Sequence, residues 1–230
     1  MWKTLSLRII STPCGTRWFS LVASLVVLVL GLVLAYAHRT QRSARLTTFL
    51  RLASVGYAMP GTVLGIGVLI PLAYFDNTVD VFMRSMFGVS TGLLLSGTIT
   101  AIIFAYAIRF LAISFGSLES GLEKVTPNLT YAARTLGRTP LRTVAEIHLP
   151  ILRPALITAT LLVFVDCMKE LPATLILRPF DFETLATQVF LLASLGQLEE
   201  SAAPALTIVA AGLIPIILLT RNLRNRESFR

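Results

Sequence analysis

The sequence predicts an all-α polytopic membrane protein with about five transmembrane helices. Of the 230 residues, 55% are hydrophobic and 14% are charged, and the mean hydropathy is +0.77. Because a soluble domain of this length carries about 25% charged residues, the composition excludes an ordinary soluble fold. The formal net charge of +8 comes from basic residues that stand between apolar segments. That distribution is typical of cytoplasmic membrane loops and argues against a nucleic-acid partner.

The N-terminal part, residues 1–51, is expected to comprise a tail, a first transmembrane helix and a basic cytoplasmic loop. Its apolar run, 18–37, is about 20 residues long, enough to span about 30 Å of hydrocarbon as a helix. A cleaved signal peptide is the alternative, because Ala-Tyr-Ala at 35–37 resembles a cleavage site. The run exceeds the usual signal-peptide length of about 7–15 residues and more apolar segments follow, so a retained helix is favoured.

Residues 52–220 hold the rest of the expected membrane core, and 221–230 are expected to form a basic cytoplasmic tail. The further spans are predicted at 52–75, 91–115, 151–171 and 202–219. The short apolar piece 184–195 would extend about 18 Å as a helix, which predicts a re-entrant or half-membrane helix. Arg109, near the end of the third run, is placed to reach lipid headgroups.

The second run is rich in glycine. Its glycines are Gly56, Gly61, Gly65 and Gly67. Small residues let helices approach closely in a bilayer, so tight packing is favoured over a direct role in lining a substrate path. The loop after this run is expected to hold the charged residues Asp76, Asp80 and Arg84.

A polar island at 126–150 separates two apolar runs and predicts two short helices joined by a turn. Thr126 and Thr139 can each cap a helix, since a proline follows both, while Gly137 suits the left-handed residue after the first helix. Pro150 is expected to close the second helix. Two alternatives are a DNA-binding helix-turn-helix, which a position between membrane spans disfavours, and two amphipathic helices lying on the membrane surface.

The spacing in this island resembles the cytoplasmic EAA loop of importer permeases of the ATP-binding cassette (ABC) class. The matching residues are Ala132-Ala133, then Gly137, then Ile-His-Leu-Pro at 147–150. In that family the loop is a coupling helix that docks into a groove of the ATPase subunit. The resemblance assigns ATPase coupling to Tyr131, Ala132, Ala133, Leu136, Gly137, Ile147, Leu149 and Pro150. Tyr131 stands where the family usually has Glu, so the charge contact that the family makes there has no carboxylate in this chain.

The fourth run carries three charged residues, Asp166, Lys169 and Glu170. A charge in the bilayer interior is costly unless it is paired or hydrated. On a helix these three residues could share one side, because they are spaced at i, i+3 and i+4. Two interpretations stay open. The residues form a self-neutralising cluster near the outer surface, or together with Pro172 they line the translocation path or its gate.

Residues 169–174, with the sequence KELPAT, resemble the stretch that follows the EAA loop in iron(III)-type ABC permeases. The match covers 52–220 and implies a MetI-like permease core of five helices with a cytoplasmic coupling helix. Iron-type permeases usually carry two such cores, and this sequence has one EAA loop, so the chain resembles their C-terminal half. Ferric iron is the expected substrate. Alternatives are thiamine, polyamine or phosphonate transport, or a truncated half that does not transport.

The resemblance also implies partners. They are a cytoplasmic ABC ATPase dimer, an extracytoplasmic binding protein that delivers the substrate, and a second permease core, either an identical chain or a separate half, all at a lipid membrane. The chain itself is expected to be no enzyme and to bind no cofactor or metal. It lacks a phosphate-binding P-loop, so ATP is expected on the partner subunit. An intramembrane enzyme is disfavoured, because Asp166 has no second membrane aspartate and both histidines lie in loops.

Basic residues predict the orientation of the chain in a bacterial-type inner membrane. The segments 38–51, 116–150 and 221–230 hold four Lys or Arg each, 12 in all, against five in the segments of the opposite side. Since cytoplasmic loops carry the excess of basic residues, the C-terminus is predicted inside and the N-terminus outside.

Overall fold

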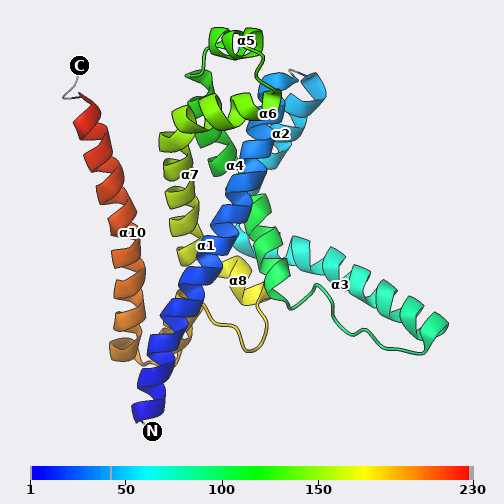
Figure 1. The fold of residues 1–230 in the computed structure, drawn as a ribbon. Coiled ribbons are helices and arrows are strands. Elements are labelled where there is room, and N and C mark those ends of the chain that lie inside the picture. The colour runs from blue at the N-terminus through cyan, green and yellow to red at the C-terminus, as the bar shows by residue number, and fades with distance from the viewer. Residues whose placement is uncertain (1, 42, 228–230) are drawn as a thin grey trace.

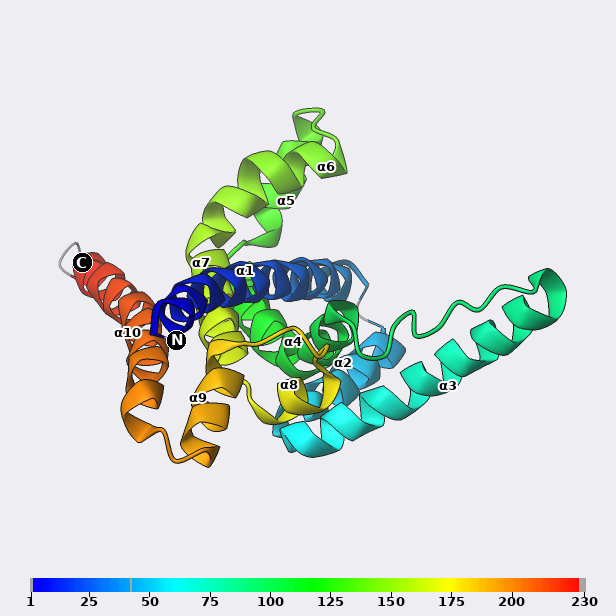
Figure 2. The same cartoon turned by 90° about the horizontal axis from the view of Figure 1, so that it is seen from below.

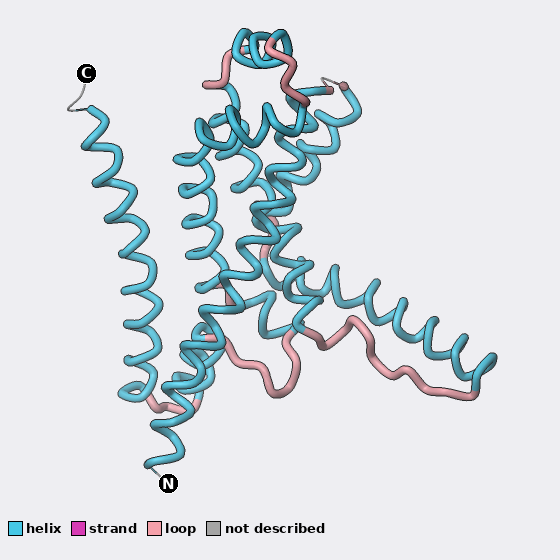
Figure 3. The backbone as a smooth tube through the Cα atoms, viewed as in Figure 1, coloured by secondary structure: helices cyan, strands magenta, loops and turns pink. Residues whose placement is uncertain are grey.

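The computed structural model describes the backbone of residues 2–41 and 43–227 and confirms an all-helical fold there (Figures 1 and 3). Side chains are described for residues 16, 18–41, 43–213 and 217. The elements are α1 (Trp2–Thr40), α2 (Ala44–Ala58), α3 (Gly61–Phe87), α4 (Ile99–Glu123), α5 (Pro127–Thr135), α6 (Pro140–Thr143), the π-helical turn η1 (Val144–His148), α7 (Leu149–Lys169), α8 (Pro172–Leu177), α9 (Leu185–Ser194) and α10 (Leu198–Glu227).

Four helical stretches of the described residues are long and apolar enough to cross a membrane. They are Trp18–Thr40, Gly61–Phe87, Ile99–Glu123 and Pro140–Lys169. The fifth predicted span, 202–219, lies within α10, and the short apolar piece 184–195 contains α9, which packs against α10 and α7. The predicted C-terminal tail continues α10 as far as Glu227, and 228–230 lie outside the described residues.

The predicted second span, 52–75, has the wrong bounds. Helix α2 stops before Met59 and Pro60, whose backbones are extended with ψ angles of 139° and 137°. A proline disfavours helical backbone at the residue before it, so the chain breaks at this point. Helix α3 then continues to Phe87, after which Gly88 ends it with a positive φ of 66°.

The three charged residues expected in the next loop lie on α3 instead. They are Asp76, Asp80 and Arg84. Asp76 is fully buried and accepts a hydrogen bond of 2.8 Å from the backbone N–H of Ser96. Asp80 accepts one from the N–H of Thr91, also at 2.8 Å. These bonds fold the connecting loop back along α3, so the third span begins at Ile99, later than predicted.

Pro150 does not close the second helix of the polar island, contrary to the prediction. Elements α6, η1 and α7 follow one another without a break, and Pro150 lies in the first turn of α7. The N–H of Leu149 donates to the carbonyl of Val144, five residues back, which widens the helix by one residue. Such a π-helical turn accommodates a local disturbance of the helical hydrogen bonds, here next to a residue without an N–H.

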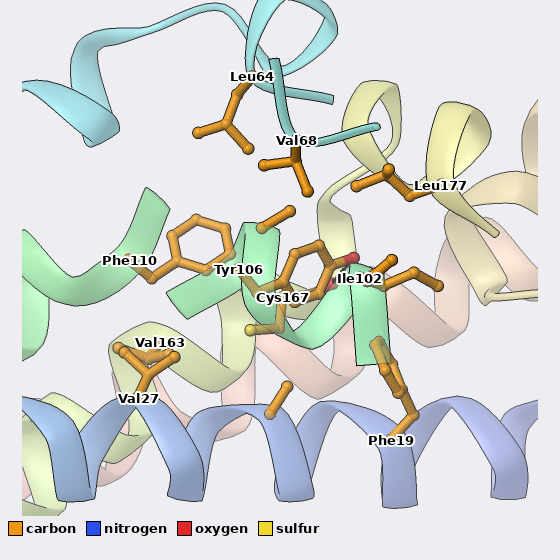
Figure 4. Close-up of a cluster of buried hydrophobic side chains, with 13 residues drawn as sticks. Phe19, Val27, Leu64, Val68, Ile102, Tyr106, Phe110, Val163, Cys167 and Leu177 are labelled. Carbon is orange, nitrogen blue, oxygen red and sulfur yellow. Dashed lines mark hydrogen bonds between the residues drawn. The ribbon is translucent and has the colours of Figure 1, made fainter. Parts of the chain in front are cut away.

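The core lies where α1, α4 and α7 pack together (Figure 1). One cluster of buried side chains also includes α3 and α8, and its centre is Tyr106 (Figure 4). The Tyr106 ring lies 5.7 Å from that of Phe19 and 5.5 Å from that of Phe110, measured between centroids. A second cluster lies further along the same three long helices. There Gly121 allows a close approach, because a Cβ at this position would lie 2.6 Å from the Cβ of Ala155.

The ends of the chain lie at opposite ends of the molecule. Figure 1 places α5 and the C-terminal end of α10 at one end, and the N-terminal end of α1 at the other. Helix α3 projects from the bundle as an arm, which is visible in both Figures 1 and 2, and it packs against α8 at its base. Two parts of the molecule stand out from the bundle: the protruding loop around α5 and the junction of α3 with α8.

Candidate functional site

The segment predicted to couple to an ATPase forms a protruding helix, α5, followed by a tight turn (Figure 1). Gly137 has a φ of 75°, the left-handed conformation predicted for it. The N–H groups of Gly137 and Arg138 donate to the carbonyls of Arg134 and Ala133, both at 3.0 Å. These two bonds satisfy carbonyls that the end of a helix leaves free. Because most side chains disfavour this φ, glycine is the residue best suited to the turn.

The two predicted helix starts differ in their hydrogen bonds. Thr139 accepts the N–H of Arg142 at 3.4 Å, with Pro140 at the first helical position, as predicted. Thr126 has the extended backbone of a cap and precedes Pro127, but its hydroxyl makes no capping hydrogen bond. The first helix therefore begins at Pro127 without a side-chain cap.

Four large apolar side chains of this segment are exposed, and we call them the apolar tip. They are Leu129, Tyr131, Leu136 and Leu141, with exposed fractions of 41%, 62%, 80% and 84%. The other predicted coupling residues divide into Ala132, Gly137 and Pro150, which are exposed, Ile147 and Leu149, which are half-buried, and Ala133, which is buried. A cluster of exposed apolar side chains marks a candidate contact surface for another protein.

His148, which the sequence placed in a polar loop, is buried. Its Nε2 lies 3.2 Å from the Oγ1 of Thr130 on α5. Its ring packs beside that of Tyr36 on α1, with the centroids 6.0 Å apart. His148 therefore joins the loop to the membrane helices and orients the apolar tip. The sequence around His148 did not indicate these contacts with α5 and α1.

A groove of ≈ 710 Å³ lies beside α5, between the ends of α1 and α4. At its wall the guanidinium of Arg39 donates to the carbonyls of Leu122 and Val125, the latter at 2.7 Å. His38 Nδ1 lies 2.9 Å from Glu119 Oε1. The basic end of α1 thus caps the end of α4 at the point where the chain turns into α5.

The three charged residues of the fourth span do not form one cluster. Lys169 Nζ lies 2.7 Å from Asp166 Oδ1, and the Lys169 side chain is 62% exposed. The Glu170 side chain is 8% exposed and pairs with Arg109 of α4, with 3.2 Å between Oε2 and Nε. The charges are therefore neutralised as two separate pairs, one at the surface and one inside.

Arg109, which the sequence placed to reach headgroups, is bonded to groups of the protein itself. Its side chain is 18% exposed, and its Nη1 donates to the carbonyl of Met59 at 2.7 Å. An arginine and a glutamate in two apolar segments are each costly alone, because hydrocarbon solvates neither charge. The presence of Arg109 and Glu170 in different predicted spans is the sequence pattern that could have indicated their pairing.

The KELPAT stretch is the place where α7 breaks. Glu170 ends α7 with an extended ψ of 113°, and α8 begins at Pro172. The Oε1 of Glu170 accepts the N–H of Ala173 at 3.4 Å. Thr174 Oγ1 donates to the Glu170 carbonyl at 2.8 Å and lies 2.6 Å from the Tyr106 hydroxyl. The break is thus hydrogen-bonded to the centre of the core.

Comparison with known proteins gives sequence relatives of one kind. No protein-family profile matches the chain. It is 33% identical over 175 residues to the putative ferric transport system permease protein FbpB 1 of Haemophilus influenzae, covering 75% of this chain and 27% of that protein. It is 25% identical over 215 residues to the putative 2-aminoethylphosphonate transport system permease protein PhnV of Salmonella paratyphi A, covering 90% and 75%. It is 27% identical over 204 residues to the sulfate transport system permease protein CysT of Salmonella typhimurium, covering 87% and 71%.

The matches differ in how much of each relative they include. The chain spans 27% and 36% of the lengths of two ferric-type permeases of Haemophilus influenzae.

Among solved structures, its fold resembles a chain of the inward-facing MetNI methionine ABC transporter, with a TM-score of 0.62 and 16% identity over 95% of this chain and 97% of that one. A chain of an amino acid ABC transporter crystallised with histidines gives a TM-score of 0.58 at 18% identity, covering 100% and 97%. At these identities the two structures establish a shared fold.

Proposed function

The chain belongs to the permease family of binding-protein-dependent ABC importers, and from this premise we propose that it is the transmembrane subunit of an ATP-driven importer. As a permease component it is not catalytic, and ATP is bound and hydrolysed by a separate ATPase dimer. The observation that carries the proposal is the apolar tip, which protrudes on a loop with the spacing of the family's coupling helix. In this assignment α5 and the C-terminal end of α10 lie in the cytoplasm, and the N-terminal end of α1 lies outside.

The apolar tip docks into a groove of the ATPase and transmits its movement. ATP binding brings two ATPase subunits together and moves their docked coupling loops. Because α6, η1 and α7 are continuous, displacement of the loop acts directly on α7. His148 and Arg39 connect the same loop to α1 and to the end of α4. Movement at the tip thereby opens the transmembrane interface outward, and ATP hydrolysis reverses it.

The proposed substrate is ferric iron delivered by an extracytoplasmic binding protein. Two ferric-type relatives, at 33% and 28% identity, support this assignment. A permease path needs only weak and transient contacts with its cargo, so we assign the selectivity to the binding protein. Phosphonate or sulfate transport is the second candidate, because this chain matches those relatives over 75% and 71% of their lengths.

A second permease core, identical or from a separate chain, completes the translocation path. In this proposal the gate lies at the α7–α8 break, where Asp166, Lys169, Glu170 and Pro172 lie. The surface pair of Asp166 and Lys169 remains accessible there, since the Lys169 side chain is 62% exposed.

The test is purification of the chain from its native membrane in mild detergent, followed by identification of the proteins that accompany it. The wild-type chain is expected to bring an ABC ATPase, and a double L136D/L141D variant is expected to lose it. The matched control is L195D, because Leu195 is 65% exposed and lies on the turn after α9, away from the apolar tip. A wild-type chain that is well folded but recovered alone would support a permease half that does not transport.

The substrate requires a separate measurement. With the ATPase and the binding protein reconstituted in vesicles, uptake of radioactive ferric iron is compared with uptake of 2-aminoethylphosphonate and sulfate. ATP-dependent accumulation of iron alone is the expected result, and accumulation of either anion in its place would move the assignment to the second candidate.

A further inference from the structure

Two helix breaks meet at one buried arginine. The break between α2 and α3 falls at Met59 and Pro60, and the break between α7 and α8 falls at Glu170. Arg109 of α4 contacts both, because it donates to the Met59 carbonyl at 2.7 Å and its Nε lies 3.2 Å from Glu170 Oε2. The two breaks are far apart in the sequence, and this one side chain contacts both of them.

Glycines bring the backbones around this arginine into close contact. A Cβ at Gly61, the first residue of α3, would lie 2.5 Å from Glu170 Oε1. A Cβ at Gly65, one turn later, would lie 3.1 Å from a side-chain carbon of Ile176 on α8. The base of the α3 arm therefore rests on the Glu170 carboxylate and on α8, and a larger residue at Gly61 would require the Glu170 carboxylate to shift.

Charge neutralisation alone does not account for this arrangement. A buried ion pair gains little over well-packed apolar residues, since desolvation of both charges offsets their attraction. Arg109, however, contacts two partners through different nitrogens of its guanidinium: Nη1 donates to the Met59 carbonyl, and Nε lies in an ion pair with the Glu170 carboxylate. A lysine ammonium is one compact charge and does not present two separated nitrogens in a fixed plane. The Glu170 carboxylate in turn accepts the N–H of Ala173 in α8. The contacts form a chain that runs from α3 through α4 to α8.

We propose that Arg109 and Glu170 form a latch that holds the two helix breaks together, so that α3 and α8 move as one body during transport. The inference rests on the proposed function and refines its gate. Both are positioning residues that act on α3 and α8, and the carboxylate of Glu170 is engaged by the protein and not by the substrate. The latch predicts that geometry, and not charge balance, is required at this pair.

The decisive variant is the double R109Q/E170Q, because it leaves no unpaired buried charge and is expected to fold. Spin labels at Ile66 on α3 and Phe180 after α8, which are 50% and 103% exposed, report the distance between the two elements. We expect a narrow distance distribution in the wild type and a broader one in the double variant. R109K keeps the positive charge but removes the guanidinium that contacts both Met59 and Glu170. We expect it to lower binding-protein-stimulated ATPase activity by about tenfold, within the usual range of coupling between sites.

The matched control is E183Q, which removes a partly exposed ion pair with 3.6 Å between Arg178 Nη1 and Glu183 Oε1. It is expected to behave as the wild type in both assays. If the double R109Q/E170Q variant has the wild-type distance distribution and wild-type binding-protein-stimulated ATPase activity, the latch is overturned. The pair would then serve only to neutralise two buried charges. Failure of the proposed function is distinguishable, because the wild-type chain would then recover no ATPase while the distance measurement still reports on the latch.

Discussion

Replacing Gly137 by alanine tests the turn after α5 without introducing a steric clash. A Cβ at this position meets no heavy atom within 4 Å, so the change acts only through the backbone φ of 75°. The left-handed conformation costs a residue with a side chain about 1–2 kcal/mol. That cost corresponds to a factor of about 5–30 in the population of the native turn. Because the turn orients the apolar tip, we expect the affinity for the ATPase to fall by up to this factor.

The assay is titration of the purified ATPase against the permease in detergent, with the dissociation constant measured for three chains. G137N serves as the matched variant, because asparagine tolerates the left-handed region better than alanine does. We expect G137N to bind nearly as the wild type and G137A to bind more weakly. Equal binding by G137A and the wild type would refute the claim that the conformation of Gly137 matters for docking.

Three further predictions concern the packing of the described residues. A methyl group at Gly121 would lie 2.6 Å from a side-chain carbon of α7, so G121A should cost about 1–3 kcal/mol through overpacking. Its midpoint of thermal unfolding in detergent should fall, whereas that of G116A, where a Cβ meets nothing within 4 Å, should not. D76A removes the acceptor of the Ser96 N–H, so amide hydrogen exchange at Ser96 should accelerate; unchanged exchange would argue against the tie between loop and α3. Y106F removes the buried hydroxyl that lies 2.6 Å from Thr174 Oγ1 and within 3.5 Å of the carbonyls of Cys167 and Glu170. It should cost about 1 kcal/mol with the fold retained, as measured by thermal unfolding.

Hydropathy and helix signals predicted the all-helical membrane architecture and much of the protruding loop. Gly137 and Thr139 behave as expected because their roles depend on neighbours within a few residues. The apolar run continues through Pro60, so hydropathy alone gave one span, 52–75, where the structure has two helices that meet at a break. At Pro150 the expectation that a proline ends a helix was wrong. A π-helical turn precedes it, and the helix continues through Pro150.

The pairing of charges could not be read from local spacing. Asp166, Lys169 and Glu170 are compatible with one helical face, yet Glu170 follows the last residue of α7 and turns to Arg109 on another helix. The burial of His148 likewise depends on the packing of α5 against α1. Contacts of this kind join residues that are distant in the sequence, so they depend on how the helices pack and not on the pattern within any one helix.

Docking of the apolar tip on an ATPase can be tested with a photo-crosslinking residue placed at position 136 of the chain in living cells. Leu136 is 80% exposed at the apolar tip, and Leu195, the control position, is 65% exposed on the turn after α9. Docking through the apolar tip predicts a crosslinked product with an ABC ATPase from position 136 and none from position 195. Crosslinking to the ATPase from position 195 but not from position 136, in chains that insert normally, would contradict docking through the apolar tip.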